Sequence, residues 1–323
     1  MTKVNRVVTI FLVILVSIVS VPATTDEQQP GKISFEFTQI TEKIYVIYGP
    51  FDLPNEHNGG FRNNPVIVLT SDGVVVFDPG GSAWAGEMIV ESLKSITSEP
   101  VIAIFNSHAH GDHWLGNEGV KRSYPNAVIY CHPLMKSKLK GEEGLFWLNQ
   151  IEQLTKNTAG GREVIVPGRT LSDGDLIRVG DTQFLIYHPG PAHTDNDIMI
   201  EIVGEEALFM GDVVRNGLLG IMESDASFSG NIAAIDHILS KDLKYYIPGH
   251  GLVGDRDMVL SYRGYLDALL KTVRKLYADD LADYEMKPFV TDAVSRYKDW
   301  AGFNIRVGAH ISRAYLEVEK EDF

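Results

Sequence analysis

The sequence has a single cysteine among its 323 residues, and this scarcity limits how the fold can be held together. One thiol cannot form a disulfide within the chain, so core packing must provide most of the stability. Cys131 ends the apolar run 127–131, a pattern typical of a buried strand, and we interpret it as a core residue rather than a nucleophile. No cysteine lies near the end of the apolar amino-terminal stretch, which argues against a lipoprotein.

Basic residues are also scarce, with 29 Lys and Arg against 43 Asp and Glu. The resulting formal charge of −14 repels phosphate backbones, so we exclude nucleic acid as a partner. The hydrophobic content of 44% is sufficient for a sizeable core, in one large domain or two smaller ones. The chain has no tandem repeat or low-complexity tract.

The chain also lacks an uninterrupted apolar run of the length, about 20 residues, that spans a membrane. The apolar run 7–21 is shorter, follows the basic residues Lys3 and Arg6, and ends in Val21-Pro22-Ala23. These features predict a cleavable signal peptide over residues 1–23 and a periplasmic or secreted protein. An uncleaved membrane anchor is the alternative.

The spacing of apolar residues predicts an alternation of strands and helices that restarts midway along the chain. The expected strands are two short ones within 35–47, then 65–69, 74–77, 101–105, 127–131, 169–171, 175–179, 182–188, 198–203, 207–210 and 245–247. The expected helices are 85–96, 116–123, 134–154, 231–239 and a helical region from 258 onward, with Leu260, Tyr265, Leu266, Leu269, Leu270, Val273 and Leu276 on one face.

A cluster of polar residues directly follows the predicted strand 101–105. His108, His110, Asp112 and His113 place three imidazoles and one carboxylate within six residues. Neutral imidazole is a ligand of zinc or iron, and the aspartate can ligate a second ion or orient a bound water. The cluster therefore predicts a metal site.

Three more candidate ligands, His193, Asp212 and His250, each lie where a predicted strand gives way to a loop. Each has Gly or Pro neighbours, which let the backbone turn tightly enough for the side chain to point over the edge of the sheet. Taken singly, such turns are more often structural. Their order along the chain is what indicates function.

The ordered motifs, together with Asp78, resemble those of the metallo-β-lactamase fold over about residues 35–255. The resemblance implies an α/β four-layer αβ/βα sandwich, with the catalytic domain at 24–255 and a C-terminal helical extension at 256–323 packed on the same domain. It also implies two zinc ions per chain. His108, His110 and His193 would hold one ion, Asp112, His113 and His250 the other, and Asp212 would bridge them. Asp78 would brace the histidine loop without binding metal.

Two metal ions can share and activate one water, so the expected activity is hydrolysis of a small ester, thioester or related substrate by a metal-bridging hydroxide. Asp112 could orient that hydroxide or carry its proton. Asp212 stands where most true β-lactamases have Cys or Ser, which disfavours a β-lactamase. Two residues separate Gly190 from His193, whereas glyoxalase II and the persulfide dioxygenases usually have Pro-Gly-His-Thr, which disfavours both.

Longer strings, at 54–64, 105–117 and 228–232, are similar to exported zinc metallohydrolases encoded with sulfur-oxidation and quinoprotein relay systems. This similarity implies periplasmic redox-system partners beside a small-molecule substrate. The alternatives are a mononuclear iron persulfide dioxygenase and a non-catalytic metal-binding accessory protein. His57, in the turn-rich stretch 51–61, is either a substrate contact or a turn residue, and Trp114 is interpreted as packing beneath the metal loop.

Overall fold

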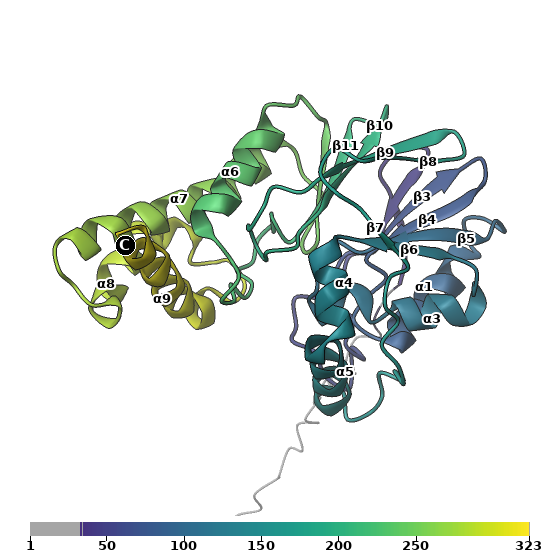
Figure 1. Cartoon of the computed structure of the whole chain (residues 1–323), viewed down its shortest axis with the longest axis horizontal. Helices are drawn as coiled ribbons and strands as arrows, with labels where there is room; N and C mark the ends of the chain where they lie inside the picture. Colours follow the sequence, from purple (N-terminus) through teal and green to yellow (C-terminus); the bar gives the residue numbers. More distant parts are fainter. Residues whose placement is uncertain (1–32, 34, 323) are drawn as a thin grey trace, which may run out of the picture. The chain divides into compact units, whose positions relative to one another are not determined.

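The computed structural model of the protein describes Ile33 and residues 35–322, whose strands form two β-sheets (Figure 1). The first sheet runs β1 (Thr38–Gln39), β2 (Ile44–Val46), β3 (Val66–Thr70), β4 (Gly73–Phe77), β5 (Val101–Phe105), β6 (Val128–Cys131) and β7 (Arg169–Thr170). The second runs β12 (Tyr245–Pro248), β11 (Ala207–Gly211), β10 (Met199–Val203), β9 (Thr182–Tyr187) and β8 (Leu176–Val179). The signal peptide predicted for residues 1–23 lies outside the described residues.

The two sheets share one apolar core, because their strands turn alternate side chains to the same side. In β4, Val75 and Phe77 belong to this core, and in β10, Ile200 and Ile202 do. The period of two along a strand therefore determines which side chains face the other sheet and which face the opposite way, as Val74 and Val76 of β4 do.

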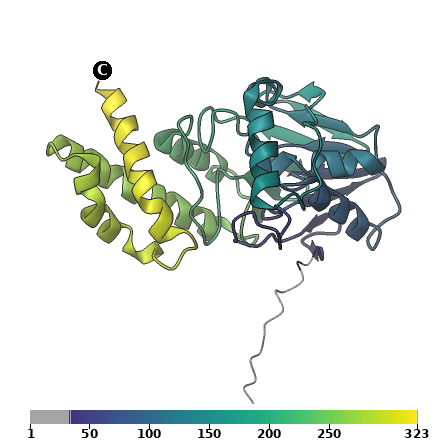
Figure 2. The same ribbon diagram turned by 90° about the horizontal axis from the view of Figure 1, so that it is seen from below.

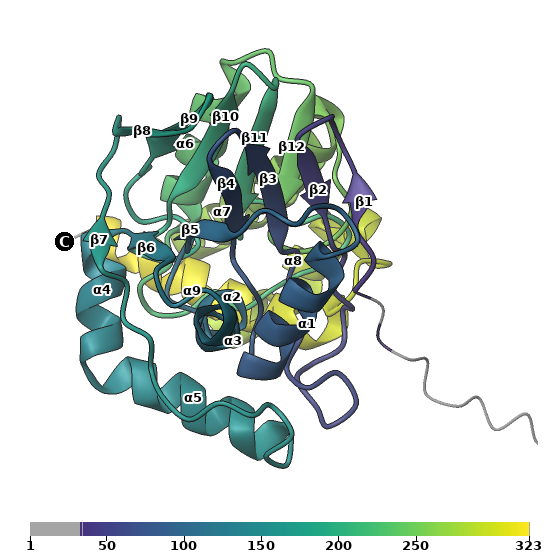
Figure 3. The same ribbon diagram turned by 90° about the vertical axis from the view of Figure 1, so that its right-hand side faces the viewer.

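Helices cover the outer faces of both sheets (Figure 3). The helices are α1 (Ala83–Leu93), α2 (Gly111–Trp114), α3 (Asn117–Ser123), α4 (Pro133–Lys140), α5 (Glu142–Leu154), α6 (Phe228–Leu239), α7 (Arg256–Ala278), α8 (Asp283–Ala293) and α9 (Phe303–Glu321), with a short 3₁₀ turn η1 (Ser295–Tyr297). α1 and α3 pack on the first sheet, and α6 and α7 pack on the second. The predicted four-layer sandwich is confirmed.

Glycines allow α1 and α3 to pack closely beside the histidine cluster. A Cβ atom at Gly119 would lie 2.0 Å from the carbonyl oxygen of Ala83, and one at Gly86 would lie 2.1 Å from that of Gly116. Such distances are far inside van der Waals contact, so both positions require glycine. The close packing holds the segment that connects the cluster to α3 against the first sheet.

The carboxy-terminal helices share a core with the second sheet (Figure 2). α7 buries a stripe made of Val259, Tyr262, Tyr265, Leu266, Leu269, Leu270, Val273 and Leu276. Leu260, which was expected in that stripe, is 41% exposed, because Val259 and Tyr262 continue the helical spacing instead. Within the described residues, none of these helices combines the length and apolarity of a membrane span.

Candidate metal centre

The seven side chains that the sequence indicated as ligands converge at the ends of strands from both sheets. His108 and His110 follow β5, Asp112 and His113 lie on α2, His193 follows β9, Asp212 follows β11, and His250 follows β12. All seven are buried, and they form two groups, His108, His110, His193 and Asp212 in one and Asp112, His113 and His250 in the other. Within each group the candidate ligand atoms lie within 4.8 Å of one another.

In the first group, ring nitrogens face one another and one carboxylate oxygen. His193 Nε2 lies 2.9 Å from His110 Nδ1. Asp212 Oδ2 lies 3.6 Å from His193 Nε2 and 3.9 Å from His108 Nε2. Three imidazoles and a carboxylate oxygen around one point match the donors and number of a tetrahedral zinc site.

The second group meets the other oxygen of Asp212. Asp212 Oδ1 lies 3.5 Å from His113 Nε2 and 3.5 Å from His250 Nε2. Asp112 Oδ2 lies 3.4 Å from His250 Nε2, and Asp112 Oδ1 lies 3.9 Å from His113 Nε2. The Asp212 carboxylate thus presents one oxygen to each group.

Several of these ligand atoms are buried without a hydrogen-bond partner, as expected where a cation completes the site. His108 Nε2, His113 Nε2 and Asp212 Oδ1 all lack a hydrogen bond in the described structure. An unpaired buried polar atom costs about 1–3 kcal/mol, so three that converge on one space require compensation. Imidazole and carboxylate donors suit zinc and related transition ions, and the residues therefore fit a pair of metal ions.

The electrostatics favour the metal-binding forms of these side chains. Burial lowers the pKa of His108 and His193 well below the usual value, and neighbouring positive side chains add to the effect. Burial alone would raise the pKa of Asp212, but Arg215 and the adjacent histidines outweigh it and hold that pKa well below its usual range. His108 and His193 are therefore neutral and the Asp212 carboxylate is charged, which are the forms that bind metal. At His113 the carboxylates of Asp212, Asp112 and Asp78 outweigh burial and raise the pKa well above the usual value, so metal binding there must displace a proton.

Asp78 lies beneath the histidine cluster and holds it through three contacts. Its Oδ1 accepts the Ser107 backbone N–H at 2.8 Å, and its Oδ2 accepts the Ser107 hydroxyl at 2.6 Å. Oδ2 also lies 2.7 Å from His113 Nδ1. A hydrogen on Nδ1 directed at this carboxylate leaves His113 Nε2 free to bind a metal ion.

The segment 62–64, whose role sequence reasoning missed, connects the loop of His250 to the residue that holds His113. The Arg62 carbonyl accepts from His250 Nδ1 at 3.0 Å, and Asn63 Nδ2 donates to the Asp78 carbonyl at 2.8 Å. Asn64 Nδ2 donates to the carbonyls of Pro248 and Gly251 on either side of His250. The sequence singled out these residues only as the end of the string 54–64 and gave them no role, because nothing in them indicated a partner so distant in sequence.

Arg215 also escaped sequence reasoning, although it lies three residues after Asp212. Its Nη2 lies 2.5 Å from Asp212 Oδ2 and 3.2 Å from His193 Nε2. The guanidinium packs over Gly220, where a Cβ atom would lie 1.9 Å from Arg215 Cζ. Arg215 is therefore a buried cation held beside the bridging carboxylate.

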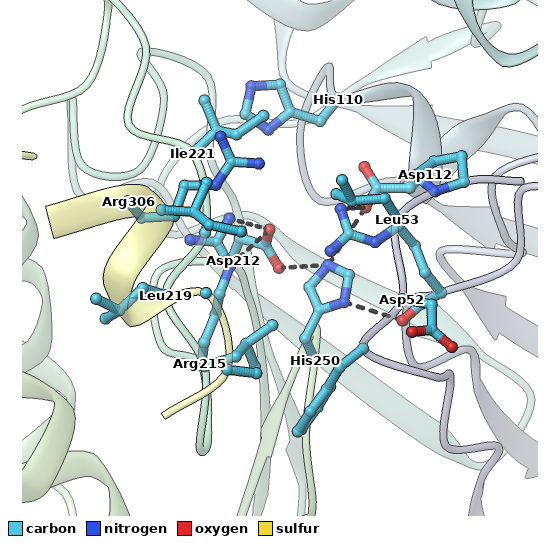
Figure 4. Close-up of a pocket in the computed structure, with 18 of the residues that line it drawn as sticks. Asp52, Leu53, His110, Asp112, Asp212, Arg215, Leu219, Ile221, His250 and Arg306 are labelled. Carbon is cyan, nitrogen blue, oxygen red and sulfur yellow. Dashed lines mark hydrogen bonds and ion pairs between the residues drawn. The ribbon is translucent and has the colours of Figure 1, made fainter. Parts of the chain in front are cut away.

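A cavity of about 460 Å³ opens beside the metal centre (Figure 4). This volume lies within the range of small-molecule sites. Of the ligands, His110, Asp112, Asp212 and His250 line it. Its other walls include Phe51, Leu53, Trp147, Ile151, Leu154, Leu218, Leu219, Ile221 and Ile305, with the guanidinium groups of Arg62, Arg215 and Arg306.

His57 is not among the residues that line this cavity. Its side chain is 64% exposed, and its nearest charged partner is Glu56, with Nε2 to Oε1 at 3.8 Å. The reason is local, since Asn55 Oδ1 accepts the backbone N–H groups of His57 and Asn58 and makes a tight turn with His57 on the outside. The same loop instead contributes Phe51 and Leu53 to the cavity.

Two other aromatic residues near the cluster have structural contacts. Trp114 is 1% exposed and its Nε1 donates to the Ala109 carbonyl at 2.9 Å, so it packs beneath the metal loop. The ring of His188 stacks on that of His132 at 3.8 Å and contacts the Asp197 carbonyl rather than a ligand.

Comparisons with known proteins agree with this geometry. The sequence model of the Metallo-beta-lactamase superfamily matches residues 58–250, more than half of the chain. A hydroxyacylglutathione hydrolase from Francisella tularensis subsp. holarctica is 26% identical over 80% of this chain and 88% of its own. An uncharacterised protein from Aquifex aeolicus is 29% identical over 45% of this chain and 62% of its own.

Solved structures show the same fold. A metallo-beta-lactamase from Pontibacter korlensis aligns with a TM-score of 0.56 at 22% identity, over 72% of this chain and 98% of that one. A stereoselective inverting sec-alkylsulfatase from Pseudomonas sp. aligns with a TM-score of 0.69 at 13% identity, over 87% of this chain and 50% of that one. At these identities the likeness concerns the fold alone.

Proposed function

The chain belongs to the metallo-β-lactamase superfamily and is a metal-dependent hydrolase, and from this premise we propose that it is an exported enzyme with two zinc ions that cleaves a small thioester or ester. The observation that carries the two-ion part of the proposal is the Asp212 carboxylate, which presents one oxygen to each group of ligands. In this position one carboxylate can bind an ion in each group at once.

Each ligand has a defined part in this proposal. His108, His110 and His193 hold one ion, while Asp112, His113 and His250 hold the other, and Asp212 joins the two groups. When bound, the ions supply Lewis acidity and lower the pKa of water in the site towards neutrality.

Two carboxylates both line the cavity and belong to the centre, Asp112 and Asp212. We assign the proton transfer to Asp112, because Asp212 is paired with Arg215 and lies between the two groups of ligands. Burial alone would raise its pKa, but His113, His250 and Arg62 hold it well below the usual range, so Asp112 is charged and accepts hydrogen bonds. From this position it can orient the attacking water and receive its proton. The apolar walls exclude bulk water from the same space.

A thioester is favoured by the relatives named for hydrolysis of hydroxyacylglutathione. The argument against a glyoxalase II-like site was the spacing of Gly190 and His193. The extra residues do not keep His193 from the ligand group, because its Nε2 lies 2.9 Å from His110 Nδ1. The spacing is therefore no argument against a glyoxalase II-like site. The identity of the substrate remains a proposal.

Export and partnership with a periplasmic redox system belong to the proposal as well. Their support is the apolar run 7–21 with its basic start and the similarity of 54–64 and 105–117 to exported metallohydrolases. Fractionation of cells that produce the full chain tests export. A periplasmic location with a shortened amino terminus is expected, and cytoplasmic protein that begins at Met1 would overturn this part.

The hydrolase proposal is tested by metal analysis together with a panel of thioesters, lactones, phosphodiesters and β-lactams. We expect two zinc ions per chain and metal-dependent turnover of a thioester or ester. Asp212→Ala should lose metal and lower turnover by more than the roughly 10- to 100-fold typical of residues outside the coordination sphere. Asp242→Ala removes an exposed aspartate and controls for the loss of one negative charge.

Other results would select the alternatives. One iron per chain with oxygen consumption on a persulfide would replace the hydrolase by a dioxygenase. Bound metal without turnover of any substrate would favour an accessory protein. Unchanged metal content in Asp212→Ala would remove the bridging role.

A further inference from the structure

Three arginine side chains line the cavity beside the metal centre. A protein of formal charge −14 has many carboxylates with which to neutralise arginines. Arginines that line a cavity without such a partner therefore indicate a binding role. Arg215 is committed to Asp212 by its ion pair. The other two, Arg62 and Arg306, retain hydrogen-bonding capacity directed at the cavity.

Arg306 has no carboxylate partner within the part of the chain that the structure describes. Its guanidinium makes no hydrogen bond or ion pair there, whereas Arg263, Arg274 and Arg122 each pair with an acid. Figure 4 shows Arg306 extending from the α9 side into the space between His110 and Asp212. Burial lowers its pKa, and the charges of Arg62 and Arg215 lower it further, so the three cations share one region.

Arg62 approaches the same cavity from the loop before β3. Its Nη1 lies 3.5 Å from Asp112 Oδ2, longer than a hydrogen bond, and its Nε is buried without a partner in the described structure. A metal ion held by Asp112 would compete with the guanidinium for this carboxylate. Like-charged groups held together at a cavity are unfavourable unless an anion neutralises them.

The position of Arg306 is preorganised by the fold. The segment before α9 is pinned to the loop after Asp212, since Ala301 N–H donates to the Gly217 carbonyl and Leu219 N–H donates to the Ala301 carbonyl, both at 2.9 Å. Gly302 then adopts a left-handed φ of 78° at the start of α9. Arg306 lies in the first turn, so little of its approach to the cavity depends on flexible backbone.

On the basis of the proposed hydrolase function, we propose that the substrate carries a carboxylate in addition to the bond that is cleaved, and that Arg306 and Arg62 bind it. Guanidinium groups pair bidentately with carboxylates. The apolar side chains of Leu218, Leu219 and Trp147 accommodate the carbon chain between the two functional groups. Arg306 is a binding residue that selects among acyl groups, distinct from the residues that hold metal.

The test compares two thioesters that differ only in this carboxylate, S-succinyl- and S-butyryl-N-acetylcysteamine, on the metal-loaded enzyme. The kcat/KM ratio of succinyl to butyryl substrate should favour the succinyl compound. Arg306→Gln should lower this ratio by about 10- to 100-fold, mainly through KM, as expected for loss of a charge-assisted hydrogen bond. Arg306→Lys should restore part of it. Arg178→Gln, which removes an exposed arginine from β8, should leave the ratio as in the wild type.

Calorimetric titration with succinate separates this proposal from the hydrolase proposal. If neither these thioesters nor any substrate of the wider panel is cleaved, the hydrolase proposal fails, yet weaker succinate binding by Arg306→Gln would still support the carboxylate site. If cleavage occurs but Arg306→Gln changes neither the substrate ratio nor succinate affinity, the carboxylate site is refuted while hydrolysis stands. Tighter binding of sulfate than of succinate by the wild type would overturn the choice of carboxylate.

Discussion

His310 should make the protein lose stability in mild acid. Its ring, 1% exposed on α9, lies between two hydrogen-bond partners, with Nδ1 2.7 Å from the Tyr265 hydroxyl and Nε2 2.8 Å from the Gly220 carbonyl. A carbonyl only accepts, so Nε2 carries the hydrogen and Nδ1 accepts from Tyr265. The buried imidazole is therefore neutral, and burial, helped by the charges of Arg215 and Arg306, lowers its pKa from 6.5 to about 4.

The sign follows from proton linkage. Because the pKa is lower in the folded protein, the neutral ring contributes its full stability above pH 6.5, and this contribution is lost as the pH falls towards 4. For a single site with these pKa values, the free energy of unfolding falls by about 2 kcal/mol between pH 7.5 and pH 5, and by about 3 kcal/mol below pH 4. His310→Gln can keep both hydrogen bonds without titrating.

The assay is urea unfolding of wild type and variant at several pH values, both with chelator so that metal release does not contribute. The decrease between pH 7.5 and pH 5 should be about 2 kcal/mol smaller in His310→Gln than in the wild type. His237→Gln, on the exposed side of α6, controls for the loss of any histidine. Equal pH dependence in wild type and His310→Gln, within about 0.5 kcal/mol, would refute the reasoning.

Two further predictions concern the loops around the centre. Asn64→Ala leaves the Pro248 and Gly251 carbonyls without their donor, so the free energy of unfolding should fall by about 2–4 kcal/mol. Metal should also bind less tightly at the His250 group, and wild-type affinity in a metal titration would show that His250 is positioned without Asn64. His57→Ala should leave metal content unchanged and alter KM by no more than about twofold, because the exposed ring lies outside the cavity. A large rise in KM, measured by steady-state kinetics, would show that His57 contacts the substrate.

The strands and the ligand groups could be predicted from sequence because both depend on local patterns. Short apolar runs bounded by turn residues defined β4 and β10, and similar runs located the strand ends that carry Asp212 and His250. The His108 to His113 cluster needed no tertiary information, since its ligands are neighbours along the chain. The strands and the cluster follow from backbone geometry and side-chain chemistry, whereas the division of the ligands between two ions came from the resemblance to the metallo-β-lactamase fold.

The supporting residues could not be found this way, because their roles arise from contacts between distant segments. Arg62 and His250 are 188 residues apart, and their contact uses a backbone carbonyl that any residue could supply. Arg306 lies on an amphipathic helix whose pattern separates buried from exposed faces but does not reveal a cavity at one end. His57 was the opposite case, where residue type suggested a role that the turn around Asn55 does not allow.

Each group of ligands contains residues from the part of the chain before residue 156 and from the part after residue 162. A metal ion bound by either group would therefore link the two parts. The first group joins His108 and His110 to His193 and Asp212, and the second joins Asp112 and His113 to His250. A protease cut in the connection between the halves, within 156–162, would leave every ligand on one fragment or the other. The two fragments should stay together while metal is bound and separate more readily once it is removed. Metal loading would thereby protect a nicked enzyme as well as activate an intact one.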